Sequence, residues 1–319
     1  MQLRQLGNTP LTVSTVGLGC NNFGLRISAD GSKPVIHKAL DLGITFFDTA
    51  DVYGRRGGSE TCLGEYLGAR RKDIVIASKF GSPMDDAGTL KGASRRYMMA
   101  AVEASLKRLK TDWIDIYQLH RFDTATPLEE TLRAFDDLIR QGKIRYAGIS
   151  SVAAWRLVDL QWTARQLDCK PLTTCEVEYS LLAREPEREL IPAIQAHGAV
   201  LLPYYPLASG FLTGKYLRNS PKPDSARITK DARYQEMYMT DANWTRLENL
   251  QAFCTQRGRT LLELAFSWLA AQPVVACVIA GATKAEQLEA NVKAADWALT
   301  PEELKEIDRI SGPAWLSAQ

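Results

Sequence analysis

Four side chains of different acid–base character stand at or just beyond the ends of three short hydrophobic runs. The four are Asp48, Tyr53, Lys79 and His120, and the runs are 44–47, 74–78 and 114–119. A carboxylate, a phenol, an ammonium and an imidazole can together move a proton to or from a substrate oxygen. Their types and spacing therefore predict general acid–base catalysis, provided that the fold brings the ends of the three runs together.

Each of these residues also has a structural explanation. Asp48 could cap a loop, and Tyr53 could pack as an aromatic side chain. Lys79 could extend into solvent, and His120 could be a hydrogen-bonded core histidine. The combination favours the catalytic interpretation, because all four would have to fall on neighbouring strand ends by coincidence.

The elements that must position these residues alternate between short β-branched runs and longer amphipathic stretches. Alternation of this kind predicts a parallel sheet covered by helices. Eight strands are expected, at 16–19, 44–47, 74–78, 114–119, 144–149, 172–175, 199–202 and 274–279. Eight such units in 319 residues predict one (β/α)₈ (TIM) barrel spanning residues 1–319 as a single domain. In such barrels functional groups gather at the carboxyl ends of the strands.

Helices and turns complete this prediction. Two short strands around the turn 7–10 predict an amino-terminal β-hairpin. Ser94 is a candidate helix cap, Pro127 suits a first helical turn, and Gly142 suits a helix end. Further helices are expected at 33–42, 59–70, 152–167, 186–197, 244–257 and 284–295. Long loops are expected at the carboxyl face, the longest being the irregular region 203–241.

With these motifs in place, the sequence resembles the aldo-keto reductase superfamily along essentially its whole length. The family's Asp, Tyr, Lys and His tetrad matches Asp48, Tyr53, Lys79 and His120, and further matching segments read G-I-S-S, E-Y-S-L-L and I-A-G-A-T-K. The resemblance implies an NADPH-dependent enzyme that reduces aldehydes or ketones to alcohols by reversible hydride transfer. Tyr53 would be the general acid, and the ammonium of Lys79 would lower the pKa of its phenol toward the working range. Asp48 would keep that lysine charged. His120 would orient and polarise the carbonyl.

The resemblance also implies where the cofactor lies. Tyr204 would stack on the nicotinamide, and Lys284 at a helix start would favour NADPH over NADH. The lone G-x-G at 17–19 lacks the third glycine of a dinucleotide fingerprint and is rejected as one. The full set of expected contacts is Gly19, Cys20, Asn21, Asp48, Ser150, Ser151, Glu176, Tyr204, Leu207, Ser209, Gly210, Lys215, Gly281, Thr283, Lys284, Gln287 and Asn291.

Two of these positions depart from the family pattern, which has Asn and Gln on the nicotinamide carboxamide. This chain has Ser151 and Glu176 there. A serine hydroxyl still donates but reaches less far, whereas an ionised Glu176 only accepts. We hypothesise that Glu176 also favours the cationic, oxidised nicotinamide.

Composition and charge argue against several other classes of protein. The net charge of +2 and the absence of a basic stripe exclude a nucleic-acid footprint. The longest apolar run, 274–280, is far shorter than the roughly 20 residues of a membrane span. The amino terminus lacks the apolar core of a secretory signal. Six cysteines without C-x-x-C spacing predict free thiols, no metal site, and a cytoplasmic location.

Two rival functions remain. Lys79 could form a Schiff base in an aldolase, but Asp48 and Tyr53 would then have no evident role. A metal-dependent hydrolase has little support, because only three histidines are present and they are not clustered. The chain could also be a cofactor-binding regulatory subunit with little turnover, like the β subunits of voltage-gated potassium channels in the same superfamily. The sequence leaves open the carbonyl substrate, the preferred direction and the oligomeric state.

Overall fold

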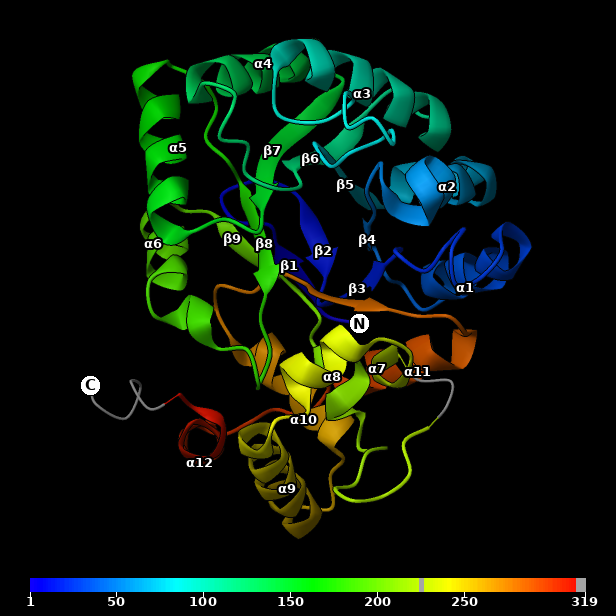
Figure 1. The fold of residues 1–319 in the computed structure, drawn as a ribbon, viewed down its shortest axis with the longest axis vertical. Helices are drawn as coiled ribbons and strands as arrows, with labels where there is room; N and C mark the ends of the chain where they lie inside the picture. Colours follow the sequence, from blue (N-terminus) through cyan, green and yellow to red (C-terminus); the bar gives the residue numbers. More distant parts are fainter. Residues whose placement is uncertain (224–226, 314–319) are drawn as a thin grey trace.

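A barrel of eight parallel strands forms the centre of the computed structural model, which describes residues 1–223 and 227–313 (Figure 1). The strand order is β10-β3-β4-β5-β6-β7-β8-β9. The strands are β3 (Val16–Gly19), β4 (Phe46–Asp48), β5 (Val75–Phe80), β6 (Ile114–Leu119), β7 (Ile144–Ser150), β8 (Thr174–Glu178), β9 (Val200–Tyr204) and β10 (Val278–Gly281). The predicted (β/α)₈ barrel is confirmed, and each strand lies within a few residues of its predicted range.

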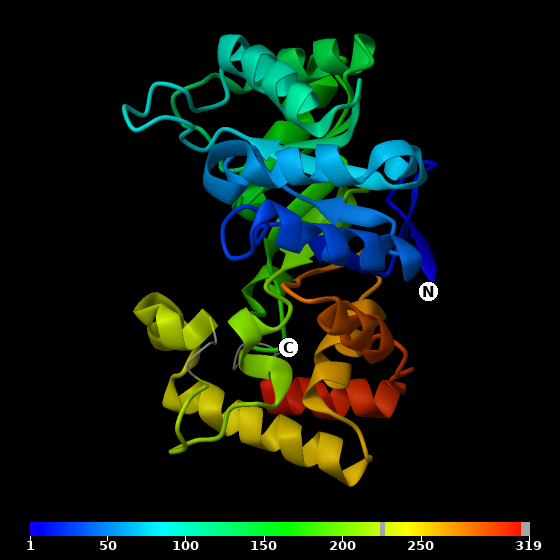
Figure 2. The same cartoon turned by 90° about the vertical axis from the view of Figure 1, so that its right-hand side faces the viewer.

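Two features close the barrel. Beside β9, the Leu201 amide donates to the Val274 carbonyl at 2.9 Å, and the Ala276 amide donates to the Leu201 carbonyl at 3.3 Å. The predicted hairpin, β1 (Leu3–Gln5) and β2 (Thr12–Ser14), places Leu6 and Val13 in the apolar cluster inside the barrel. Figure 2 shows this hairpin at one end and the 81–92 loop and α7–α8 at the other.

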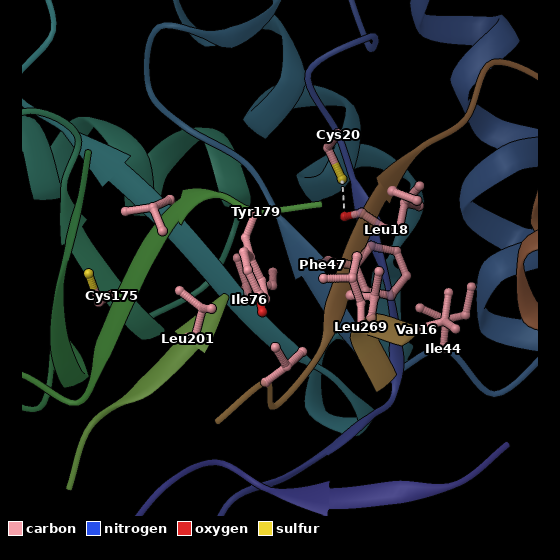
Figure 3. Close-up of a cluster of buried hydrophobic side chains, with 14 of the residues drawn as sticks. Val16, Leu18, Cys20, Ile44, Phe47, Ile76, Cys175, Tyr179, Leu201 and Leu269 are labelled. Atoms are coloured by element: carbon pink, nitrogen blue, oxygen red, sulfur yellow. Dashed lines mark hydrogen bonds between the residues drawn. The ribbon is translucent and has the colours of Figure 1, made fainter. Parts of the chain in front are cut away.

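Alternation along each strand separates two environments. Outward side chains such as Phe47, Ile76 and Leu201 pack in the layer between the strands and the helices (Figure 3). Inward side chains, among them Phe46 and Ile116, fill the part of the barrel interior that lies away from the carboxyl ends of the strands. Nearer the carboxyl ends the inward positions become polar, which places charged groups at the barrel mouth.

The helices follow the strands along the chain, and in Figure 1 α1–α6 surround the strands from the right, over the top, to the left. They are α1 (Ala29–Asp41), α2 (Tyr53–Tyr66), α3 (Arg95–Leu109), α4 (Leu128–Arg140), α5 (Ala154–Gln166), α6 (Leu190–Ala196), α7 (Arg227–Lys230), α8 (Ala232–Tyr238), α9 (Asp241–Gln256), α10 (Leu261–Ala271), α11 (Ala285–Ala294) and α12 (Pro301–Ser311). Short 3₁₀ segments are η1 (Gly68–Asp73), η2 (Glu185–Glu187) and η3 (Ala208–Thr213). None of the helices in the described ranges is long and apolar enough to cross a membrane.

Several boundaries were predicted correctly from local chemistry. The Ser94 side chain accepts from the Tyr97 amide at the start of α3, and Gly142 follows α4 with φ +72°. Pro127 is the cap residue of α4 rather than part of its first turn.

Four helices were missed. The first two, α7 and α8, lie within the expected irregular region 203–241. The other two, α10 and α12, begin at capping boxes headed by Thr260 and Thr300 that the sequence analysis overlooked.

Candidate active site

Asp48 and Lys79 form a buried ion pair where β4 and β5 end. Asp48 is the last residue of β4, and the inward pleat of β5 points Lys79 at it. The Lys79 side chain is fully buried. Its ammonium donates to Asp48 Oδ1 at 2.5 Å and to the Thr49 carbonyl at 3.1 Å. A buried ammonium requires such partners to remain charged.

Tyr53 and His120 lie beside this pair. Tyr53 begins α2, and the ammonium of Lys79 lies 5.1 Å from the centroid of its ring. The His120 ring meets the Tyr53 ring edge-on, with centroids 5.6 Å apart. A tight turn follows Tyr53, with residues 54–57 at positive φ, and a Cβ at Gly54 would lie 2.5 Å from the Phe23 carbonyl oxygen. The structure therefore brings the four predicted residues together.

Glu176 joins the same cluster from across the barrel. Its Oε2 lies 3.2 Å from the Lys79 ammonium and accepts a 2.8 Å hydrogen bond from Gln118 Nε2. The Thr174 hydroxyl in turn donates to Gln118 Oε1 at 2.9 Å. Sequence reasoning assigned Glu176 only to the cofactor, and it missed Gln118 and Thr174. Gln118 could have been found from alternation, since it lies two residues before His120 on the inward face of β6.

Burial and charge act in opposite directions on this cluster. Burial alone would lower the pKa of Lys79, but the charges of Asp48 and Glu176 raise it well above its usual range. Burial, and then the charge of Glu176, raise the pKa of Asp48 to about 8 against the effect of Lys79. The lysine is thus held as an ammonium by two carboxyl groups.

The Tyr53 phenol behaves differently from the sequence expectation. Burial raises its pKa above the usual range; Lys79 opposes this rise, and Asp48 and Glu176 add to it. The effect of Lys79 therefore has the expected sign but is outweighed, so that Tyr53 is a protonated phenol at neutral pH. Burial, then Lys79 and Arg121, lower the pKa of His120 to about 3, which keeps the imidazole neutral. A phenol and a neutral imidazole are both hydrogen-bond donors.

The residues expected at the nicotinamide meet on the rim of β7 and β9. Ser150 is the last residue of β7 and Ser151 follows it. The Ser151 hydroxyl lies 3.4 Å from both the Ser150 and the Tyr204 hydroxyl oxygens. Ser151 is exposed at the mouth with φ +53°. This arrangement leaves hydroxyl groups and an aromatic ring available to a planar ligand.

Polar atoms without partners occur at two further expected contacts. Asn21 Oδ1 is buried and has no hydrogen-bond partner among the described residues, and the same holds for Ser209 Oγ. A Cβ at Gly281 would lie 3.4 Å from Asn21 Oδ1, and a Cβ at Gly210 would lie 3.5 Å from the Lys215 ammonium. Buried groups in this state fit a polar ligand, since unsatisfied atoms are costly.

The remaining expected contacts lie at the end of β3, along η3, and in α11 with the residues just before it. Gly19 and Cys20 follow one another at the end of β3, Leu207 precedes η3, and Asn291 is buried in α11. Gln287 Oε1 accepts from the Thr283 amide at 2.8 Å and from the Lys284 amide at 3.3 Å. A phosphate at this helix start would therefore compete with Gln287 for these two amides.

A cavity of about 760 Å³ has none of the four tetrad residues in its lining. It shares Ser151 with the expected nicotinamide contacts, and Glu178, Leu182 and Tyr238 also line it. No group of three or more His, Cys, Asp or Glu side chains arranged to hold a metal occurs in residues 1–223 and 227–313. All six cysteines are free thiols.

Comparison with known proteins agrees with this geometry. The model of the Aldo/keto reductase family matches residues 15–311. An uncharacterized oxidoreductase of Bacillus subtilis is 35% identical, over 97% of this chain and 96% of its own. The probable voltage-gated potassium channel subunit beta of Arabidopsis thaliana is also 35% identical, with the same coverage. The L-glyceraldehyde 3-phosphate reductase of Escherichia coli K12 is 35% identical, over 97% of this chain and 92% of its own.

Proposed function

Since the chain belongs to the aldo/keto reductase family and is an oxidoreductase, we propose that it uses NADPH to reduce aldehydes or ketones to alcohols. The observation that carries this proposal is the buried Asp48–Lys79 pair beside the Tyr53 and His120 rings. The cofactor, when bound, supplies the hydride. The protein must then neutralise the charge that develops on the carbonyl oxygen.

Tyr53 performs that neutralisation as the general acid. Its phenol is protonated at neutral pH, so it can transfer its proton to the carbonyl oxygen during reduction. The Lys79 ammonium stabilises the phenolate that remains. His120 donates a hydrogen bond that orients the carbonyl. For alcohol oxidation the same phenolate acts as the base.

The cofactor would lie across the barrel mouth. Ser150 and Ser151 would hold the carboxamide, Tyr204 would stack on the nicotinamide, and Asn21 would gain a partner for its buried oxygen. Leu207, Ser209, Gly210 and Lys215 would lie along the pyrophosphate. At the adenosine end, Lys284 would supply a charge for the 2′-phosphate, which is our reason for proposing NADPH over NADH. Six free cysteines fit a reducing compartment, and we place the protein in the cytoplasm.

The first experiment joins cofactor binding with turnover. NADPH is titrated by fluorescence, and its oxidation is then followed with a panel of aldehydes and ketones. We expect turnover that Tyr53→Phe abolishes while NADPH binding is kept, because only the acidic hydroxyl is removed. Failure of both NADPH and NADH to bind would contradict the proposal.

The panel includes phosphorylated aldehydes for a specific reason. The Escherichia coli relative is named for the reduction of L-glyceraldehyde 3-phosphate. In this chain Arg121 follows His120 directly, and its charge contributes to the lowered pKa of that imidazole. A phosphate attached to the substrate could therefore meet a guanidinium next to the catalytic groups.

A second candidate is a cofactor-binding regulatory subunit with little turnover. The relative in Arabidopsis thaliana named as a probable potassium channel β subunit supports it. The complete tetrad favours turnover instead. Tight NADPH binding without oxidation by any member of the panel would favour the regulatory subunit.

A further inference from the structure

Glu176 adds a second carboxyl group beside the Lys79 ammonium and so changes the charge of the active site. Its Oε2 lies 3.2 Å from the Lys79 ammonium, which also contacts Asp48 at 2.5 Å. All three side chains are at least 95% buried. We propose that Glu176 is a positioning residue that makes the buried Lys79–Asp48–Glu176 cluster retain one carboxyl proton, and that loss of this proton slows alcohol oxidation relative to carbonyl reduction.

Charge balance explains why one proton is held. With both carboxylates ionised, one ammonium and two carboxylates would bury a net charge of −1. An uncompensated buried charge is costly, whereas a neutral cluster with one protonated carboxyl is not. Burial, and then the charge of Glu176, raise the pKa of Asp48 to about 8. The cluster therefore loses its carboxyl proton near that pH.

The other titratable groups that face Glu176 carry no positive charge. The charge of Glu176 contributes to the raised pKa of Tyr53 from α2, of Tyr204 from β9 and of the neighbouring Cys175 thiol. Gln118 from β6 and Ser150 from β7 are neutral. Lys79 is thus the only cation among the described groups that face Glu176, and it has two carboxyl partners.

Release of the proton changes the two reaction directions differently. The added negative charge disfavours the Tyr53 phenolate, since like charges raise the pKa of an acid. Alcohol oxidation needs this phenolate as its base and is held back above pH 8. Carbonyl reduction needs the phenol and is maintained. This inference rests on the proposed reductase activity.

The first test compares the two directions in wild type and Glu176→Gln. The amide is isosteric and cannot ionise, so the variant keeps a neutral Lys79–Asp48 pair at every pH. The quantity compared is the ratio of kcat for alcohol oxidation to kcat for carbonyl reduction. At pH 7 this ratio should be the same in the variant as in wild type. At pH 9 it should rise about tenfold, the effect of one pKa unit on Tyr53. The proposal would be overturned if variant and wild type had the same ratio at both pH values. It would also be overturned if their ratios differed by the same factor at both.

Glu178→Gln is the matched control. Glu178 lies two residues further along β8, and its carboxylate accepts from the Tyr238 hydroxyl rather than contacting Lys79. The control removes one carboxylate from the same strand and should keep the wild-type dependence on pH. The same loss in both variants would assign the effect to charge in general and contradict a specific role for Glu176.

A second test does not depend on turnover. Infrared spectra of the cofactor-free protein report buried protonated carboxyl groups. Wild type should lose one such band near pH 8 that Glu176→Gln lacks, measured in the Asp51→Asn background to remove another buried carboxyl. If wild type shows this band but reduces no carbonyl, the proposed function has failed and this inference has not. Identical bands in both proteins would overturn the inference.

Cofactor affinity gives a third readout. The extra negative charge should attract the cationic ring of NADP⁺, so the Kd ratio of NADP⁺ to NADPH should fall in wild type between pH 7 and 9. In Glu176→Gln the ratio should stay constant. A ratio independent of pH in wild type would contradict the proposal.

Discussion

The reactivity of Tyr53 depends on three competing influences. Burial disfavours the phenolate, Lys79 favours it, and the two carboxyl groups disfavour it. A residue with these neighbours serves better as an acid than as a base at neutral pH. We therefore expect Tyr53 to enter the proposed reaction as the protonated phenol, which is the form that carbonyl reduction uses.

His120 gives a prediction at this scale. With a pKa of about 3, its imidazole is neutral throughout the range in which an ordinary histidine would titrate. We expect kcat/KM for reduction to show no ionisation between pH 5 and 7.5. His120→Gln should be slower, roughly 10²-fold for loss of an oriented donor, with an unchanged profile. Steady-state kinetics across this range is the measurement, and an acidic limb that disappears in His120→Gln would indicate an imidazolium instead.

At the scale of elements, the turn between β4 and α2 positions Tyr53, the proposed general acid. It contains Asp51, which is 1% exposed and has no hydrogen-bond partner among the described residues for either carboxyl oxygen. Burial, and then Glu60, raise the pKa of Asp51 to about 8 against the effect of Arg108. The turn thus carries a carboxyl group that is neutral in the folded protein at pH 7.

This carboxyl makes stability depend on pH. In the unfolded chain Asp51 ionises above about 4, whereas in the folded protein it ionises only above about 8. The folded state therefore loses stability as the pH rises from 4 to 8. We expect Asp51→Asn to be more stable than wild type at pH 8, by on the order of 2 kcal/mol, and equal at pH 4.

Urea unfolding at pH 4, 6 and 8 measures the effect. Asp112→Asn, which changes an exposed carboxylate, is the control and should show no such trend. A gain in stability that is the same at all three pH values would show that ionisation of Asp51 is not the cause.

At the scale of the whole molecule, the barrel gathers groups that are distant in sequence around one mouth. The proposed cofactor contacts run from Gly19 to Asn291, so we expect binding to stabilise the entire fold. At 100 times the Kd, NADPH should add about 2.7 kcal/mol to the free energy of unfolding. Thermal unfolding with and without cofactor measures this gain.

Lys284 tests the proposed selectivity for NADPH at the same scale. Lys284→Ala removes a charge proposed to meet the 2′-phosphate, so NADPH affinity should fall roughly tenfold while NADH affinity stays unchanged. Lys293→Ala, at the other end of α11, is the matched control. An equal loss for NADPH and NADH would place Lys284 away from the 2′-phosphate.

Local chemistry in the sequence determined the order of strands and helices, and with it the position of each tetrad residue at or just beyond a strand end. Alternation, caps and turn residues act over a few neighbours, so they can be read from the sequence alone. Ser94 and Gly142 illustrate this, whereas α10 was missed because its apolar residues surround the helix and show no single face.

Only the tertiary structure decided what surrounds Lys79. Glu176 lies on β8, which is not a neighbour of β5 in the sheet, and the two side chains meet because the closed barrel turns both inward. The sign of the Tyr53 pKa shift was decided in the same way. It depends on burial and on summed charges from separate strands, and both exist only once the barrel has closed.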